Sequence, residues 1–167
     1  MTSADRTPRS FTLTWTLDAP PETVFDAWTN PERLGWFYND QQPVPDEPIE
    51  LDLRVGGVWR QMMVIDDETS YFSGGVYREI VPNERLVLAW GATDGWPQLD
   101  LEDLDKSPQV TLRLKQTGSG TKMTLHVELP ADLPDDGVPN WWPLFRGGMK
   151  DTVDRLAAEL DQTPVQT

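Results

Sequence analysis

Histidine and cysteine, two residue types often used in acid–base and nucleophilic chemistry, are scarce in this chain. Cysteine is absent, so no thiol nucleophile, disulfide or Cys-based metal site can form, and His126 is the one histidine. His126 alternates with Leu125 and Val127, a pattern typical of a strand with one buried face, so the imidazole is expected on the polar face. We predict a solvated histidine there and assign no catalytic residue.

Glu79 is the carboxylate with the clearest potential for chemistry. It follows Gly75 and Tyr77 at every second position, so the three residues share one face of a predicted strand. If that face looks inward, burial raises the pKa of the carboxyl group and makes Glu79 a candidate acid or an anchor for a polar ligand group. The alternative is a surface glutamate paired with Arg54 or Arg60.

Acidic residues gather after Gly91, but not in the order of a metal site. Asp100, Glu102, Asp103 and Asp105 lack the glycine and the terminal glutamate of a calcium-binding loop. We interpret them as part of a solvated acidic loop over 91–108, which is functional or disordered. We expect no metal ion and no cofactor.

The balance of charged residues argues against two classes of binding partner, nucleic acids and anionic membranes. The chain has 14 Lys and Arg against 28 Asp and Glu, a formal net charge of −14. Binding to nucleic acid or to an anionic membrane depends on clustered basic residues, and those of this chain are scattered. Residues 1–10 are polar, unlike a signal peptide, and no stretch approaches the roughly 20 apolar residues of a membrane span. We therefore expect a cytoplasmic protein that binds neither nucleic acid nor membrane.

A single domain over 10–161 is predicted between polar, flexible tails at 1–9 and 162–167, which suits a length of 167 residues. Alternating apolar and polar residues predict seven antiparallel strands, at 11–17, 49–55, 58–65, 71–81, 85–90, 110–114 and 123–129. Within the fourth strand, Gly74 and Gly75 indicate a bulge or a close approach of backbone.

Helices are predicted after the first strand and at the end of the chain. Pro20 and Pro21 open one, because proline is tolerated in the first helical turn, and Pro31 starts a second short one. A last, long helix carries an apolar stripe of Trp142, Phe145, Met149, Val153, Leu156 and Leu160. Strands in a row between helices predict an α+β fold, with the long helix packed on one face of a curved sheet.

Four stretches of the chain carry a family resemblance. They are the run 19–37, the turn and strand 56–59, the strand 75–82 with the residues up to Trp90, and Arg155-Leu156 near the end. Together they resemble the family of activators of heat-shock protein 90 ATPase, a branch of the START-like (SRPBCC) superfamily. The resemblance implies a helix-grip fold, in which a curved seven-stranded antiparallel sheet wraps around a long C-terminal helix and two short helices follow the first strand.

The resemblance also implies a pocket between the sheet and the final helix, which in many relatives holds a small hydrophobic molecule. Eight tryptophans, five phenylalanines and three tyrosines give the chain more aromatic surface than a minimal core needs. The candidate cavity residues are Trp59, Met63, Tyr77, Glu79, Leu88, Trp90, Phe145, Met149 and Val153. The alternative is that these side chains simply pack together as core.

We therefore expect a non-enzymatic domain that binds a small hydrophobic or aromatic ligand. One alternative is a polyketide cyclase-like or dehydratase-like enzyme in the same cavity, for which Glu79, Tyr77 and Arg60 are the nearest acids and bases. Another is a protein-interaction module that forms a homodimer or binds a chaperone through Trp96 or Trp141. The eukaryotic namesakes bind a chaperone and stimulate its ATPase, but that role normally needs a further domain.

Overall fold

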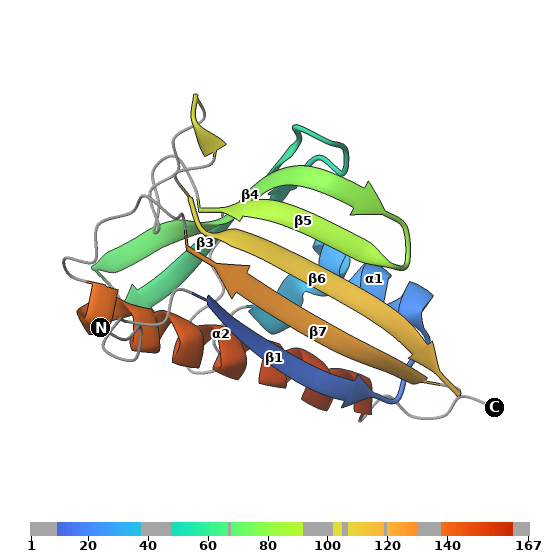
Figure 1. Ribbon diagram of the computed structural model, residues 1–167. Coiled ribbons are helices and arrows are strands. Elements are labelled where there is room, and N and C mark those ends of the chain that lie inside the picture. Colours follow the sequence, from blue (N-terminus) through green and yellow to red (C-terminus); the bar gives the residue numbers. More distant parts are fainter. Residues whose placement is uncertain are drawn as a thin grey trace, which may run out of the picture.

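A computed structural model of the chain describes residues 10–37, 48–66, 68–91, 102–104, 107–118, 120–129 and 138–161. The predicted tails and most of the predicted acidic loop lie outside these residues. Along the chain the elements are β1 (Ser10–Leu17), α1 (Pro21–Thr29), the 3₁₀ helix η2 (Pro31–Phe37), β2 (Glu50–Leu51), β3 (Val58–Asp66), β4 (Thr69–Val81), β5 (Arg85–Trp90), β6 (Gln109–Thr117), β7 (Gly120–Glu128) and α2 (Val138–Asp161) (Figure 1).

The seven strands form one antiparallel sheet in the order β1-β7-β6-β5-β4-β3-β2. In Figure 1 α1, η2 and α2 lie behind this sheet, and a single buried cluster joins residues of all three helices to residues of the strands. The helices therefore cover one face. The predicted seven-stranded sheet, the two helices after the first strand and a C-terminal helix are confirmed, and together they fit the helix-grip fold.

Local sequence explains the first two helices. Pro20 is extended at the N-cap of α1, and Pro21 occupies the first turn, where no backbone N–H needs an intrahelical partner. Asn30 leaves the helical conformation ahead of Pro31, as a residue that precedes proline tends to do. The side chain of Trp28 then points into the core, where its indole N–H donates to the sulfur of Met123 at 3.4 Å.

The predicted second strand is much shorter in the structure. Only Glu50–Leu51 pairs with its neighbour, as β2. Beyond it the chain turns, and the amide of Arg54 donates to the carbonyl of Asp52 at 2.9 Å. Leu53 and Val55 are consequently 42% and 66% exposed. Their alternation with polar residues predicted a buried face, but a turn satisfies the backbone groups locally, so the strand ends before that face is covered.

A polar contact ties the C-terminal helix to the edge strand β1. The indole N–H of Trp15 donates to one carboxylate oxygen of Asp154 at 2.8 Å, and the ammonium of Lys150 donates to the other at 2.7 Å. The hydrogen bond from Lys150, followed by that from Trp15, lowers the pKa of Asp154 below its usual value of 3.8. The folded state therefore favours the charged carboxylate.

We expect this contact to make stability depend on pH in acid. Because the pKa of Asp154 is lowered on folding, its contribution is complete above the pKa of the unfolded chain and is lost as pH falls through the folded value. The urea midpoint of the wild type should exceed that of Asp154→Asn at pH 6, and the difference should shrink toward pH 3. Asp151→Asn, an exposed neighbour on α2, is the control. A difference that stays constant with pH would contradict the assignment.

Candidate functional site

An aromatic cluster lies where η2 meets β3 and β5. The ring of Phe37 contacts those of Trp59 and Trp90, at centroid distances of 5.0 and 6.0 Å. Trp59 and Trp90 lie 5.4 Å apart with their planes at 83°, which is edge-to-face packing. Trp36 extends the cluster, 5.5 Å from Phe37 and 4.9 Å from Trp28. Aromatic rings from the two helices α1 and η2 and from two strands thus form one continuous buried cluster.

Two consecutive glycines let these rings meet across β4. In the strand register Gly75 lies opposite Trp59 on one side and Trp90 on the other, so no side chain stands between the two indoles. A Cβ atom at Gly75 would lie 2.5 Å from the carbonyl oxygen of Ala89. At Gly74 the backbone has φ of 135°, and a Cβ atom would overlap the carbonyl oxygen of Trp59. The predicted close approach of backbone at this pair is confirmed.

Most of the predicted cavity residues belong to one buried cluster. Six of them are at most 6% exposed and lie together in it: Trp59, Tyr77, Leu88, Trp90, Met149 and Val153. Met63 is half-buried and packs against the same cluster. Phe145 lies on α2, but its side chain is outside the described residues. The structure therefore brings residues of β3, β4, β5 and α2 together, and Glu79 is the exception.

Glu79 does not face the cluster, contrary to the prediction. On β4 Tyr77 lies opposite Leu88, whereas Glu79, two residues later, lies opposite the adjacent Val87. This β-bulge turns Glu79 to the outer face of the sheet. Its carboxylate accepts hydrogen bonds from Arg85 at 3.0 and 2.9 Å, and these lower its pKa. The expectation of a buried carboxyl group with a raised pKa is wrong, and the alternative of a surface glutamate is confirmed, with Arg85 as its partner in place of Arg54 or Arg60.

Tyr77 keeps the inward position. Its residue is 1% exposed, and its hydroxyl oxygen is buried without a hydrogen-bond partner in the part of the chain that the structure describes. Burial raises the pKa of the phenol, so the hydroxyl stays protonated at neutral pH and remains a hydrogen-bond donor. Of Tyr77 and Glu79, it is therefore Tyr77 that places a polar group inside the buried cluster.

Other buried polar groups near the cluster are paired. The side-chain oxygen of Gln61 accepts from the indole N–H of Trp59 at 3.1 Å, and its amide nitrogen donates to the carbonyl of Leu34 at 3.4 Å. Gln61 is fully buried, and this bridge links β3 to η2. Sequence reasoning gave Gln61 no role, although its place two residues after Trp59 in an inward-facing stripe was the available signal.

Arg155 joins η2 to the C-terminal helix. Its guanidinium donates to the carbonyls of Trp36 at 3.0 Å and Phe37 at 3.2 Å, the last two residues of η2. Carbonyls at the end of a helix have no intrahelical partner, so a cation from α2 satisfies them and holds the aromatic residues of η2 against the cluster. Arg155 lies in one of the stretches that carry the family resemblance, but its sequence position alone predicted no contact.

The residues proposed for an enzyme do not form one site. The guanidinium carbon of Arg60 lies 3.4 Å from the ring centroid of Phe72, and a guanidinium nitrogen lies 3.8 Å from the carboxylate of Glu50. Because Arg60 alternates with buried neighbours on β3, it lies on the outer face, as Glu79 does on β4. Tyr77 lies on the opposite, buried face.

His126 is solvated, as predicted. It lies on the outer face of β7, where Nδ1 is 2.8 Å from the hydroxyl oxygen of Thr12 and Nε2 is 3.7 Å from the carboxylate of Glu128. Its side chain is 38% exposed. The three residues have the types of a hydrolytic triad, but they lie on an open strand face.

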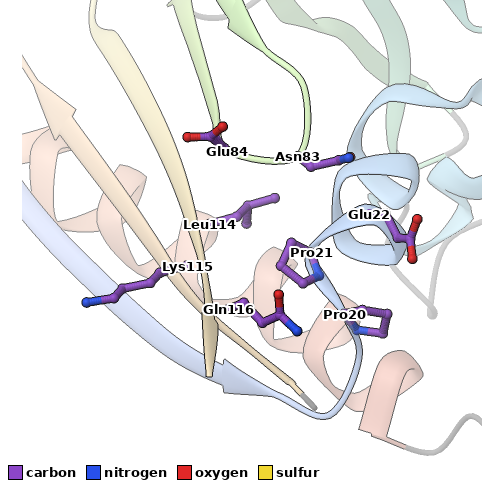
Figure 2. A pocket seen from close by; sticks show the side chains of 8 residues that line it. All are labelled: Pro20, Pro21, Glu22, Asn83, Glu84, Leu114, Lys115 and Gln116. Carbon is purple, nitrogen blue, oxygen red and sulfur yellow. The ribbon is translucent and has the colours of Figure 1, made fainter. Parts of the chain in front are cut away.

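A surface pocket of about 470 Å³ opens elsewhere, between the start of α1, the β4–β5 turn and the end of β6. Figure 2 shows the side chains of Leu114 and Gln116 on the same side as Pro21, while Lys115 points away. Pro20, Glu22, Asn83 and Glu84 complete its lining. This mixture of two carboxylates, two prolines and other side chains does not indicate a particular class of ligand.

The structure tests the remaining predictions only in part. Trp96 and the side chain of Trp141, predicted contacts for a protein partner, lie outside the described residues, as do Asp100 and Asp105. Within the described ranges, no three His, Asp or Glu side chains are grouped closely enough to hold a metal ion. Among the helices described, none combines the length and apolar character needed to cross a membrane.

Several solved structures and one protein family are similar to this chain. Three similar solved structures are a protein from Rhizobium leguminosarum (25% identity, TM-score 0.69, covering 92% of this chain and 94% of that one), one from Rhodobacter sphaeroides (16%, 0.71, 96% and 97%) and DynU16, a protein in the dynemicin biosynthetic locus (19%, 0.64, 93% and 48%). No curated protein matches the chain. The model of one family, "Activator of Hsp90 ATPase homolog 1-like protein", matches residues 18–161. The chain therefore belongs to the Activator of Hsp90 ATPase homolog 1-like family.

Proposed function

We propose that the protein binds a small hydrophobic or aromatic molecule between the sheet and α2 and carries out no chemistry on it. The observation that carries this proposal is the Tyr77 hydroxyl, buried in apolar surroundings without a partner among the described residues. An unpaired buried hydroxyl costs on the order of 1–3 kcal/mol, and native proteins rarely leave one. A bound molecule that reaches the hydroxyl removes that cost.

The side chains around Tyr77 suit an apolar ligand. Trp59 and Trp90 come from the sheet, Met149 and Val153 come from α2, and all four belong to the same buried cluster as Tyr77. Aromatic rings offer flat apolar surface, and methionine adapts its shape to irregular ligands. The two layers that would enclose a ligand thus present compatible surfaces.

Binding without catalysis is proposed because the ionisable groups point elsewhere. Glu79 is paired with Arg85, and Arg60 stacks on Phe72, both on the outer face. Tyr77 cannot act as a general base near neutral pH, since burial raises the pKa of its phenol. An apolar site with one neutral hydroxyl can hold and orient a molecule but offers no acid–base pair to transform it.

A thermal-shift screen against fatty acids, isoprenoids, flavonoids and aromatic polyketides tests the proposal. A ligand present at about 100 times its dissociation constant stabilises the folded state by about 2.7 kcal/mol, which raises the melting temperature by roughly 5–10 °C for a chain of this size. We expect a shift of that order with at least one class, and we expect Met149→Trp to abolish it by filling the site.

Asp151→Trp, an exposed position on the same helix, is the matched control and should keep the shift. A shift that survives Met149→Trp would place the ligand elsewhere and contradict the proposed site. The absence of a shift with every class would reject small-molecule binding of these kinds.

A further inference from the structure

Several buried polar groups around the proposed site have hydrogen-bond partners. Trp59 donates its indole N–H to Gln61, and Trp36 donates its own to the carbonyl of Ala27 at 3.0 Å. The amide of Gln61 and the guanidinium of Arg155 donate to carbonyls of η2. Within the part of the chain that the structure describes, the Tyr77 hydroxyl is the one buried side-chain polar atom left without a partner.

The position of this hydroxyl relative to the indoles limits the shape of a ligand. Tyr77 lies two residues after Gly75 on β4, so both face the same side, and Gly75 is where Trp59 and Trp90 meet. Two strand residues span about 6.6 Å. A molecule that packs on the indoles and also reaches the phenol therefore carries its polar atom at one edge of an apolar body.

The chemistry of the hydroxyl limits the polar atom. A protonated phenol is a good donor, and its natural partner is a carbonyl or ether oxygen. A carboxylate is disfavoured, because an unpaired buried charge is costly. The guanidinium of Arg155, which contacts Trp36 and Phe37 of the cluster, already donates to the carbonyls of these two residues.

We propose that the ligand is a neutral aromatic molecule with one hydrogen-bond acceptor, such as an aryl ketone, and that the Tyr77 hydroxyl donates to that acceptor. This inference rests on the proposed function. It adds the chemical class of the ligand and names Tyr77 as the residue that recognises the ligand's acceptor atom. Aliphatic chains and aromatic hydrocarbons fill the same space but leave the hydroxyl unpaired. Discrimination of this type is strong, because the wrong ligand leaves a buried polar group unsatisfied.

A pair of probes of equal size tests the donor role. 2-Acetylnaphthalene carries a carbonyl, and 2-isopropenylnaphthalene, with the same number of non-hydrogen atoms, carries a terminal methylene group (C=CH₂) in place of the carbonyl oxygen. Dissociation constants for both are measured by tryptophan fluorescence or calorimetry with the wild type, with Tyr77→Phe and with Tyr71→Phe, a half-buried tyrosine elsewhere on β4. We expect Tyr77→Phe to weaken binding of the ketone about tenfold, to change binding of the hydrocarbon less than about twofold, and Tyr71→Phe to change neither.

The outcomes separate the two proposals. If both probes bind and Tyr77→Phe weakens them equally or not at all, the acceptor inference is overturned while ligand binding stands. If neither probe binds, both proposals fail for aromatic ligands.

A second readout concerns the protein without ligand. Removing an unpaired hydroxyl should leave the melting temperature of Tyr77→Phe equal to or above that of the wild type, because Phe fills the same space without a desolvated polar atom. A melting temperature several degrees lower would show that the hydroxyl already has a partner within the ligand-free protein, and it would overturn the inference.

Discussion

Gly74→Ala is expected to lower the free energy of unfolding by about 3–5 kcal/mol, a large loss for the addition of one methyl group. Two effects combine at this position. The backbone φ of 135° is one that residues with a side chain rarely adopt, and the added Cβ atom would overlap the carbonyl oxygen of Trp59 on the neighbouring strand. The strand β3 would have to move, and with it the indole that contacts Trp90 and Phe37.

Gly118→Ala measures the cost of a positive φ, in the left-handed helical region, without a close contact. Gly118 also has a positive φ, of 61°, but nothing lies within 4 Å of a Cβ atom built there. That variant should lose only about 1–2 kcal/mol. Urea unfolding followed by tryptophan fluorescence gives both values. Equal losses in the two variants would mean that the backbone conformation alone sets the cost and that the close approach to β3 does not matter.

Gln61→Leu is the second change with a large expected effect, a loss of about 2–4 kcal/mol despite similar volume and greater hydrophobicity. Leucine can neither accept from the Trp59 indole nor donate to the Leu34 carbonyl, so two buried polar groups lose their partner. Gln116→Leu, an exposed glutamine on β6, is the control and should change stability by less than about 0.5 kcal/mol.

A double-mutant cycle identifies the Trp59–Gln61 hydrogen bond as the cause. In Trp59→Phe the indole donor is gone, so adding Gln61→Leu should cost less than it does in the wild type. Strictly additive losses would show that the two side chains act independently, in conflict with the 3.1 Å hydrogen bond.

The alternation of apolar and polar residues predicted correctly those features of the fold that depend on residues close together in the sequence. The alternation of β1 and β7 gave the inward face correctly, including the outward position of His126, because each of these strands pairs over its whole length. The same reasoning placed Glu79 inward, and it failed there because one extra residue at the bulge after Tyr77 reverses the alternation. A bulge depends on how β4 is held between β3 and β5, which the sequence of β4 alone does not specify.

In the candidate site, too, some features could be predicted from the sequence and others depend on residues distant in sequence. Apolar residues such as Trp59, Trp90 and Met149 could be assigned to the space between sheet and helix from pattern and family resemblance. Whether a buried polar group has a partner depends on side chains distant in sequence, such as Arg155 and Trp36, which lie 119 residues apart. For this reason the paired state of Gln61 and the unpaired hydroxyl of Tyr77 emerged only from the structure.

The strand order has a consequence for how the chain acquires its fold during synthesis. β1 is synthesised before the other described strands, yet among them it pairs with β7 alone, which begins at Gly120. At 5–20 residues per second, the apolar side of β1 waits roughly 5–20 s for its partner. The helix that covers β1 follows later still. The sheet is therefore expected to form largely after synthesis of β7, and the pairing of β1 with β7, which are distant in sequence, is expected to make folding slow.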